Sequence, residues 1–367
     1  MGDKKLKVVI IDDSAFVRIA LRRMLTEAGF EVVGVAKDGP EGIEMVKRTR
    51  PDVVSLDVNM PGMQGTEVLD HLLADEWVPV VMCSTLTKRG ADVTMDCLSR
   101  GAVDFVTKPE RREDWGYLAR VLPLKLKIAA QAKRPKAKVA RRPRSTRAVR
   151  SAALSRAKVN FMLGSAKGLV LIAASTGGPR SVEAVTSALP GDMPFPVIVV
   201  QHMPAGFTQS FAERLNRSSQ LACKEAEEGE RLEPGKLYVA PGGYHMTIEN
   251  GVVRLNQEPP VWGVRPAADV TFKSVVQPYG PKSVVVVLTG MGCDGAEGAR
   301  ELKNAGATVI AESENTAIIY GMPKAVVELG AATRVLDIDA IPGAIVEAVE
   351  EKLSGRASRR AFNSRVA

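Results

Sequence analysis

The chain has 367 residues, of which 45% are hydrophobic, and a formal net charge of +8. This length suits about two domains, and no stretch reaches the roughly 18 apolar residues of a membrane span. The N-terminus enters a charged strand rather than an apolar signal segment, and the four cysteines form neither a metal-binding spacing nor a disulfide framework. We therefore expect a reduced, cytoplasmic protein and exclude membrane-spanning and disulfide-stabilised secreted classes.

Residues 1–124 alternate between strand and helix patterns. A helix with an apolar face follows the first strand and stops at Gly29. Such a rhythm predicts a parallel sheet covered by helices on both faces. We expect strands at 7–11, 31–36, 52–57, 78–84 and 104–107.

Polar side chains stand at the ends of these predicted strands. Asp12 and Asp13 follow the first strand, and Asp57 ends the third. Three carboxylates at one rim would repel one another without a cation, and hard oxygen ligands suit Mg²⁺. Ser84 ends the fourth strand and Lys108 follows the fifth. A hydroxyl and an ammonium beside the carboxylates suit a phosphoryl group received by a carboxylate.

With these residues, and with SLDVNMPGMQG around Asp57 and Thr107-Lys108-Pro109, this region resembles the receiver domain of two-component response regulators. The resemblance implies a flavodoxin-like (βα)5 fold, Asp57 as phosphoacceptor and a sensor histidine kinase as phosphodonor. It also implies Ser84 and Lys108 as the groups that sense the phosphoryl oxygens. The implied Mg²⁺ site comprises Asp12, Asp13, Asp57 and the carbonyl of Asn59.

The positive charge is concentrated between the two predicted domains. Residues 125–158 contain 13 Lys or Arg and no Asp or Glu. Contact with nucleic acid or an acidic membrane would explain this charge, but interleaved aromatic residues and a recognition fold are missing. We therefore assign 125–159 as a basic flexible linker and expect no specific nucleic-acid partner.

The strand and helix rhythm resumes in residues 160–355. It predicts a mostly parallel, doubly wound sheet with an antiparallel hairpin at 246–256, turned at Asn250-Gly251. A basic tail at 356–367 is expected to be disordered. The other strands are expected at 168–175, 196–202, 236–241, 283–290 and 307–313, and helices at 179–189, 206–217 and about 340–353.

Three residues of this second region form a candidate Ser-His-Asp triad. Ser175 ends one predicted strand, His202 ends the next, and Asp294 follows a third. Ligands gather outside the carboxyl ends of parallel strands, so these side chains are expected to meet there. Taken singly, Ser175 could cap the following helix and His202 could be a satisfied residue at a strand end.

The same region also contains a dinucleotide-binding pattern. Gly290-Met291-Gly292-Cys293-Asp294-Gly295 reads G-x-G-x-x-G after a strand, and Glu312 lies where a ribose-binding acid would stand. Against this reading, the Asp294 carboxylate would crowd a pyrophosphate at the helix N-terminus. The glycine pattern still leaves a nicotinamide-dependent oxidoreductase open as one alternative function. A DNA-binding response regulator, which would explain the receiver and the basic linker, is another.

The motifs AASTGGP, VVQHMPAGFT, YVAPGGYHM, RPAADVTF, LTGMGCDGAEG and YGMPKAV follow one another as in the chemotaxis protein-glutamate methylesterases, the CheB family. The chain departs from the hydrolase elbow at Ala173, where a glycine would stand. The resemblance implies catalytic Ser175, His202 and Asp294, with no cofactor in this domain. Residues expected near the oxyanion or the substrate are Thr176, His245, Met291 and Gly292, with a core role left equally open for His245.

The implied activity is phosphorylation-regulated hydrolysis of glutamate methyl esters on methyl-accepting chemotaxis receptors. The same chemistry would deamidate glutamine, which makes glutaminase activity a second expectation. We expect the unphosphorylated receiver to cover the catalytic site and phosphorylation of Asp57 to weaken that contact. A monomer without a membrane span is the expected state.

Overall fold

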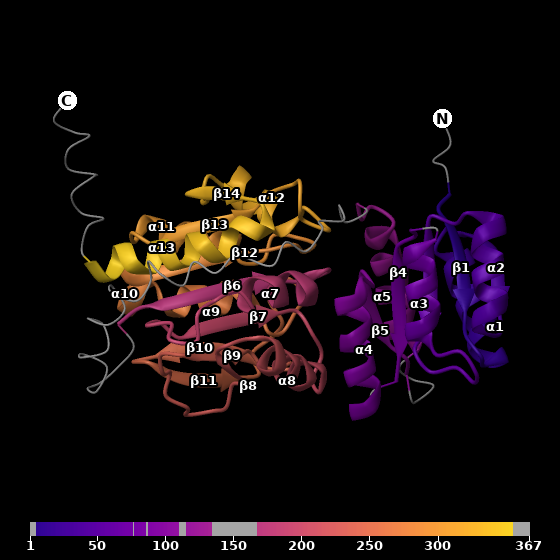
Figure 1. Cartoon of the computed structure of the whole chain (residues 1–367), viewed down its shortest axis with the longest axis horizontal. Coiled ribbons are helices and arrows are strands. Elements are labelled where there is room, and N and C mark those ends of the chain that lie inside the picture. The colour runs from indigo at the N-terminus through magenta and orange to yellow at the C-terminus, as the bar shows by residue number, and fades with distance from the viewer. Residues whose placement is uncertain (1–4, 76, 86, 110–114, 134–166, 355–367) are drawn as a thin grey trace.

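The computed structural model describes residues 5–75, 77–85, 87–109, 115–133 and 167–354. They form a five-stranded sheet and a seven-stranded sheet that occupy opposite ends of the long axis of the molecule (Figure 1). No helix within these ranges is long and apolar enough to cross a membrane. Most of the expected basic linker and the whole expected basic tail lie outside the described residues.

The five-stranded sheet confirms the predicted (βα)5 arrangement. Its strands are parallel, in the order β2-β1-β3-β4-β5. Side chains cap several of the helices, as Ser14 does by accepting a hydrogen bond from Val17 N and Thr87 from Gly90 N. The elements are β1 Lys7–Ile11, α1 Ala15–Glu27, β2 Glu31–Ala36, α2 Gly39–Thr49, β3 Val53–Asp57, α3 Gly65–Ala74, β4 Val80–Ser84, α4 Lys88–Arg100, β5 Asp104–Thr107 and α5 Trp115–Ala129.

The first domain extends beyond the predicted boundary at residue 124. Helix α5 continues to Ala129, and Leu126 and Ile128 are buried in the core beside β1 and β4. The high density of Lys and Arg from residue 125 onward suggested a linker, yet the apolar residues between them continue the buried helical face. The boundary at 124 was therefore placed too early.

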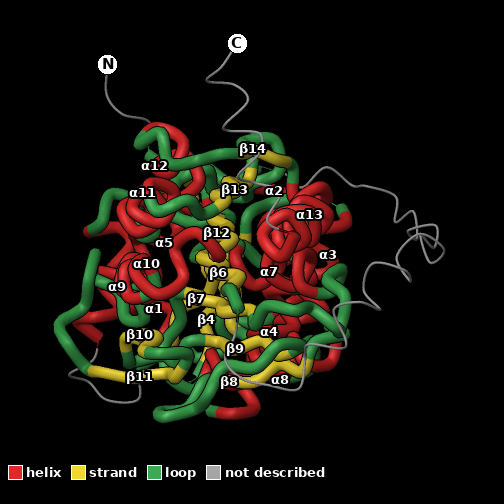
Figure 2. The backbone as a smooth tube through the Cα atoms, turned by 90° about the vertical axis from the view of Figure 1, so that its left-hand side faces the viewer, coloured by secondary structure: helices red, strands yellow, loops and turns green. Residues whose placement is uncertain are grey.

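The seven-stranded sheet is parallel throughout, in the order β14-β13-β12-β6-β7-β9-β8. In Figure 2 its strands form a central column, with α9, α10 and α11 on one side and α7 and α13 on the other. The elements are β6 Leu169–Ala174, α7 Gly178–Thr186, β7 Val197–Gln201, α8 Phe207–Ser218, β8 Ala222–Glu225, β9 Lys236–Val239, α9 Ala268–Ser274, α10 Val276–Tyr279, β12 Ser283–Val287, α11 Ala296–Asn304, β13 Thr308–Glu312, α12 Met322–Glu328, β14 Arg334–Leu336 and α13 Ile341–Ser354.

The predicted hairpin forms, but as a sheet of its own. Strands β10 His245–Glu249 and β11 Val252–Asn256 pair only with each other among the named strands of the described chain. Its turn places Asn250 at φ 50° and Gly251 at φ 77°. Two consecutive positive φ angles are what a tight two-residue hairpin turn requires, and Asn-Gly tolerates them.

The edge strands β8 and β14 escaped prediction because their sequences are short and partly polar. β8 reads ACKE, and β14 has only three residues, none of them buried. Neither shows the long apolar run that marks the inner strands of a parallel sheet. The helices α9, α10 and α12, with four to seven residues each, were likewise not expected.

The two domains contact each other through α4 and β5 of the first domain and through α7, α8 and the residues that follow β6 of the second. Helix α4 packs against α7 and α8. The rings of Phe105 and Phe207 stack across the boundary, with centroids 4.4 Å apart. At the periphery, Arg214 pairs with Asp96 at 3.5 Å. The carboxyl ends of β6 and β7 therefore face the first domain, which places the candidate catalytic residues beside this boundary (Figure 1).

Candidate phosphorylation and catalytic sites

Three carboxylates and one ammonium meet at the carboxyl edge of the five-stranded sheet. Oxygen atoms of Asp12, Asp13 and Asp57 all lie within 4.8 Å of one another. Lys108 Nζ lies 2.7 Å from both Asp12 Oδ2 and Asp57 Oδ2. The structure thus brings together the acidic residues and the lysine that the sequence placed at separate strand ends.

Burial and neighbouring charges leave Asp57 poorly stabilised as an anion. Burial raises the pKa of Asp57 to about 6, against the opposing effect of Lys108 and with a further rise from Asp12. Burial also lowers the pKa of Lys108, but the two carboxylates outweigh it and the net shift is upward. One ammonium faces three carboxylates, so the cluster retains excess negative charge that a cation would neutralise.

The donor set fits Mg²⁺. It consists of carboxylate oxygens, two of them on buried residues and one on the exposed Asp13, which leaves positions for water. Asn59 lies on the rim, where its backbone N–H donates to Asp57 Oδ1 at 3.3 Å. When bound, the ion would neutralise charge that develops on a phosphoryl group at Asp57.

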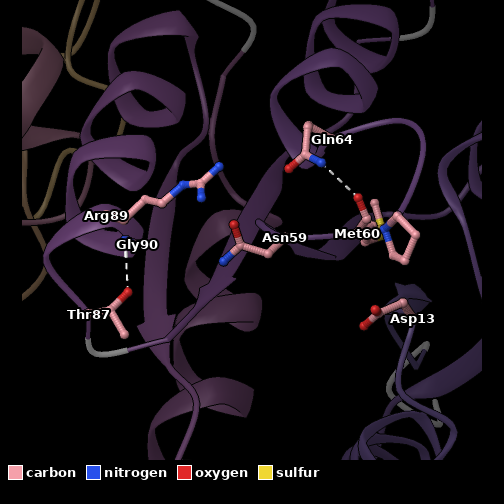
Figure 3. Close-up of a pocket in the computed structure, with 8 residues that line it drawn as sticks. Asp13, Asn59, Met60, Gln64, Thr87, Arg89 and Gly90 are labelled. Carbon is pink, nitrogen blue, oxygen red and sulfur yellow. Dashed lines mark hydrogen bonds between the residues drawn. The ribbon is translucent and has the colours of Figure 1, made fainter.

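A hollow of about 460 Å³ opens beside this cluster. Figure 3 shows the side chains of Asp13, Asn59 and Arg89 on different sides of it. The buried Ser84 hydroxyl instead donates toward Gly90 O at 3.2 Å, on the first turn of α4. Sequence reasoning missed Arg89, because a single arginine early in an amphipathic helix carries no distinguishing signal.

The three candidate catalytic residues follow three adjacent strands, β12, β6 and β7. Ser175 comes directly after β6, His202 directly after β7, and Asp294 lies in the loop after β12. His202 Nε2 and Asp294 Oδ2 are 2.7 Å apart. The parallel register therefore joins the histidine and the aspartate, 92 residues apart in sequence, as expected.

Asp294 is held as an anion. Besides His202, its carboxylate accepts hydrogen bonds from the backbone N–H groups of Ala268 at 2.6 Å and Asp269 at 2.9 Å. Burial alone would raise the pKa of Asp294, but His202 and these N–H donors outweigh it and lower the pKa below its usual value. An ionised Asp294 can only accept, so His202 Nε2 carries the shared proton and its Nδ1 is left as the basic nitrogen.

Ser175 is held by its backbone. Its N–H donates to Thr289 O at 3.0 Å, and its carbonyl accepts a hydrogen bond from Gln201 Nε2 at 2.9 Å. Within the described residues, no hydrogen bond links the Ser175 hydroxyl to His202. Gln201 was missed by sequence reasoning, although its place directly before His202 could have drawn attention to it.

The first domain forms hydrogen bonds with the two residues that directly follow Ser175. Thr176 Oγ1 donates to Asp104 Oδ2 at 2.5 Å, and Gly177 N donates to Val103 O at 3.0 Å. Lys125 Nζ, 2.6 Å from Asp104 Oδ1, holds that carboxylate from the other side. Thr176 was expected near the nucleophile, and it lies there with its hydroxyl turned to the first domain.

The other predicted substrate-side residues differ in exposure. Met291 is 41% exposed and Gly292 is also exposed, so both are accessible from solvent. His245 is fully buried, with Nε2 at 3.1 Å from Pro259 O and Nδ1 accepting from Ala267 N. Both ring nitrogens are therefore occupied, so of the two roles left open for His245 the structure agrees with the core role and not with a substrate contact.

The dinucleotide-binding alternative also fails. Glu312 is 0% exposed and accepts a hydrogen bond from Thr289 N at 2.8 Å, so it cannot reach a ribose. Asp294 lies two residues before the start of α11, and its negative charge would repel a pyrophosphate at that helix N-terminus. Residues 167–354 form a seven-stranded α/β domain, which likewise disagrees with a short helix-turn-helix output.

Comparisons with known proteins agree with this division of the chain. Residues 8–116 match the response regulator receiver domain, and residues 170–345 match the CheB methylesterase. The CheB methylesterase catalytic domain of Thermotoga maritima is 44% identical and covers 50% of this chain and 99% of its own, with a TM-score of 0.48.

Two curated relatives extend over nearly the whole chain, and both are named protein-glutamate methylesterase/protein-glutamine glutaminase. The relative from Archaeoglobus fulgidus is 45% identical over 96% of this chain and 100% of its own length. The relative from Pyrococcus horikoshii is 45% identical over 95% of this chain and 94% of its own. The chain therefore belongs to the protein-glutamate methylesterase/protein-glutamine glutaminase family, in which a receiver domain precedes a CheB methylesterase domain.

Proposed function

We propose that this protein hydrolyses glutamate methyl esters on chemoreceptors, with Ser175 as nucleophile, His202 as base and Asp294 as the residue that orients the base. The observation that carries the proposal is the 2.7 Å contact between His202 and an ionised Asp294, beside a serine at the end of the adjoining strand. The names of the relatives that match the full chain support the same substrate class.

In this mechanism the Ser175 hydroxyl attacks the ester carbonyl while His202 Nδ1 takes its proton. Asp294 stabilises the imidazolium that forms, and His202 then returns the proton to methanol as it leaves. Water, activated by the same nitrogen, releases the glutamate carboxylate from Ser175. A glutamine side chain would react in the same way with ammonia as the leaving group.

Backbone N–H groups are available for the oxyanion. Those of Thr176, Met291 and Gly292 donate to no other group in the part of the chain that the structure describes. Thr176 directly follows the nucleophile, and Gly290, next to Met291, lies against Ser175. Removing one donor of this kind typically costs about 10²–10³ in turnover.

Regulation would act through the receiver domain. Asp104 and Val103 engage the two residues after Ser175, and the Ser175 hydroxyl lacks a bond to His202 among the described groups. This arrangement has the character of an inhibited state. A phosphoryl group on Asp57, with Mg²⁺ at the carboxylate cluster, would bias the equilibrium toward an undocked, active arrangement. The phosphodonor would be a sensor histidine kinase.

The decisive experiment measures methanol release from methylated chemoreceptor membranes by the intact protein and by Ser175→Ala. Release that requires Ser175 and rises with Mg²⁺ and a small acyl phosphate is the expected result. Methanol release that persists in Ser175→Ala would contradict the serine mechanism. Release that ignores the phosphodonor would contradict the regulation alone.

Ammonia release tests the second activity. Receptors that carry glutamine at the modified positions are incubated with the intact protein and with Ser175→Ala, and ammonia is measured. Ammonia that depends on Ser175 is the expected result. Its absence, alongside normal methanol release, would remove the deamidase from the proposal.

A further inference from the structure

Glu312 is a buried carboxyl group that the proposed mechanism does not use. It ends β13, is 0% exposed, and has no cationic partner among the described residues. Burial raises its pKa to about 7, in spite of hydrogen bonds from Thr289 and Thr316 that favour the anion. An uncompensated buried acid is unfavourable for folding, and buried acids of this kind occur at functional sites.

One carboxylate oxygen of Glu312 is linked to the nucleophile through Thr289. Glu312 Oε2 accepts a hydrogen bond from Thr289 N at 2.8 Å, and Thr289 O in turn accepts one from Ser175 N at 3.0 Å. The Thr289 hydroxyl points its one proton toward Thr176 O at 3.0 Å and Ile319 O at 3.2 Å. Thr289 therefore binds the main chain at both Ser175 and Thr176, and Glu312 fixes the orientation of Thr289.

Thr289 also begins the loop that carries Asp294. Gly290 follows it and packs so closely on the nucleophile that an added Cβ would lie 2.8 Å from Ser175 Cβ. Gly290 N donates to Ile319 O at 3.0 Å, and Ile319 N donates to Thr289 Oγ1 at 2.9 Å. A shift of Thr289 would thus be transmitted to the serine and to the start of the aspartate loop together.

The second oxygen of Glu312 is anchored on the opposite side. Thr316 Oγ1 donates to Glu312 Oε1 at 3.0 Å and accepts a hydrogen bond from Ile338 N at 3.0 Å. Both carboxylate oxygens are therefore engaged, one toward the catalytic side and one toward the segment after β13. The carboxyl group therefore bridges the backbone of Thr289 and the side chain of Thr316.

We propose that Glu312 is a positioning residue for the serine reaction. Through Thr289 it fixes the backbone of Ser175 and the start of the loop bearing Asp294 in position relative to each other. This inference rests on the proposed function, since it assigns a role within that triad. Productive attack requires Ser175 Oγ within hydrogen-bonding reach of His202 Nδ1, and a displacement of about 1 Å can cost roughly 10²-fold in rate.

The test compares Glu312→Met with Glu312→Gln in the full-length protein, with Mg²⁺ and a small acyl phosphate present. Methionine removes both acceptors at similar volume, whereas glutamine keeps one carbonyl oxygen for Thr289 N. We expect kcat for methanol release to fall about 10- to 100-fold in Glu312→Met, with KM within about twofold. Glu312→Gln should restore most of the rate.

A matched control separates positioning from stability. Ser283 is fully buried at the opposite end of β12, where its hydroxyl donates to Tyr279 O at 3.0 Å. Ser283→Ala removes a buried hydrogen bond from the same strand but not from the network at Ser175. It should lower the urea midpoint while leaving kcat unchanged. A loss of rate in Ser283→Ala as large as that in Glu312→Met would overturn the proposal.

A second readout reports on the nucleophile directly. The rate at which a small sulfonyl fluoride modifies Ser175 needs no receptor, and it should fall in Glu312→Met in parallel with kcat. If Glu312→Met does not fold, Thr316→Val takes its place in the test. Thr316 is only partly buried, and losing its hydroxyl removes the hydrogen bond to Glu312 Oε1. We expect it to slow Ser175 modification about two- to fivefold, and an unchanged rate would overturn the proposal.

The outcomes distinguish this inference from the proposed function. If the unmodified protein neither releases methanol nor reacts at Ser175, the proposed function itself fails. If it does both, and the Glu312 and Thr316 variants keep its rates, only the positioning role fails. A double variant of Glu312→Met with Thr289→Val should lose less than the product of the two single losses, because both act through Thr289.

Discussion

Asp57 and Asp294 are both buried carboxylates near the carboxyl edge of a parallel sheet, yet their pKa values shift in opposite directions. Asp57 faces two further acids and a single lysine, and its pKa rises to about 6. Asp294 receives two backbone N–H donors and a histidine, and its pKa falls. The fold position is alike, so the difference comes from the donors that the neighbouring loops supply.

This difference matches two kinds of chemistry. A carboxylate that orients a base must stay ionised throughout the reaction, and fixed N–H donors ensure this without a mobile ion. A carboxylate that receives a phosphoryl group needs an accessible oxygen and a site for a cation. The excess negative charge of Asp12, Asp13 and Asp57 provides the site for the cation. Substitutions at Asp294, Asp57 and Asp104 and the addition of Mg²⁺ test this difference.

The largest effect is expected from Asp294→Asn. The amide would present N–H to the backbone donors or to His202, so the imidazole would lose its orienting acceptor. By analogy with other serine triads we expect kcat to fall about 10³–10⁴-fold. Methanol release under saturating receptor measures it, and sulfonyl fluoride modification of Ser175 should slow as well. A loss below tenfold would show that Asp294 does not orient the base.

Asp57→Asn should abolish the response to a phosphodonor and also stabilise the receiver domain. The folded pKa of Asp57 lies about two units above its ordinary value, so the folded state binds more protons than the unfolded state between about pH 4 and 6. Stability from this group therefore falls as pH rises through that window, by roughly 3 kcal/mol at most. Urea unfolding at pH 7.5 should show a higher midpoint for the variant.

Magnesium provides the complementary measurement. Adding Mg²⁺ at pH 7.5 should raise the urea midpoint of the unmodified protein, because the ion neutralises the carboxylate cluster. The same addition should have much less effect in Asp57→Asn, or at pH 5, where Asp57 is largely protonated. An equal effect of Mg²⁺ on both proteins would place the ion elsewhere.

Asp104→Ala tests the carboxylate that lies between the two sites. It removes the acceptor of the Thr176 hydroxyl and the partner of Lys125. A hydrogen bond to a charged group contributes about 1.5–3 kcal/mol, so domain docking should weaken and methanol release without phosphodonor should rise about 3- to 10-fold. Phosphodonor should then add little. Unchanged basal release would mean that docking does not limit activity.

The smallest effect is expected from Lys88→Gln. Lys88 and Glu213 bridge the domains with atoms 3.8 Å apart, but the lysine side chain is 71% exposed. Exposed pairs of this kind contribute about 0–1 kcal/mol. Basal methanol release should change less than about twofold, which makes this variant a control for Asp104→Ala.

The inner strands and the residues at their ends could be predicted because each signal was local. A buried run such as residues 169–174 followed by Ser175 is visible in the sequence, and the parallel register then brings Ser175, His202 and Asp294 to one edge. The end of α5 could not be placed, because lysines next to buried leucines resemble a linker in composition.

Other features depend on contacts between distant segments, so the local sequence could not predict them. The burial of His245 follows from packing of the hairpin against residues 259 and 267, and the contact between Asp104 and Thr176 spans two domains. The environment of Glu312 could not be predicted for the same reason. Its spacing after the glycines suggested a ribose, and only its burial and its bond to Thr289 reveal a different environment.

The bond from Gly177 N to Val103 O joins two main chains across the domain boundary. Every residue supplies a backbone C=O group, so substitutions at Val103 would leave the acceptor in place. Gly177 differs, because its φ is 76° and an added Cβ would lie 2.8 Å from Ile318 Cδ1, so this position requires glycine. Side chains at the periphery can diversify during evolution and adjust how tightly the domains associate, while this contact beside Ser175 persists. With Gly177 in place, only a movement of one domain as a whole removes the bond, which makes this point of the boundary responsive to conformational change.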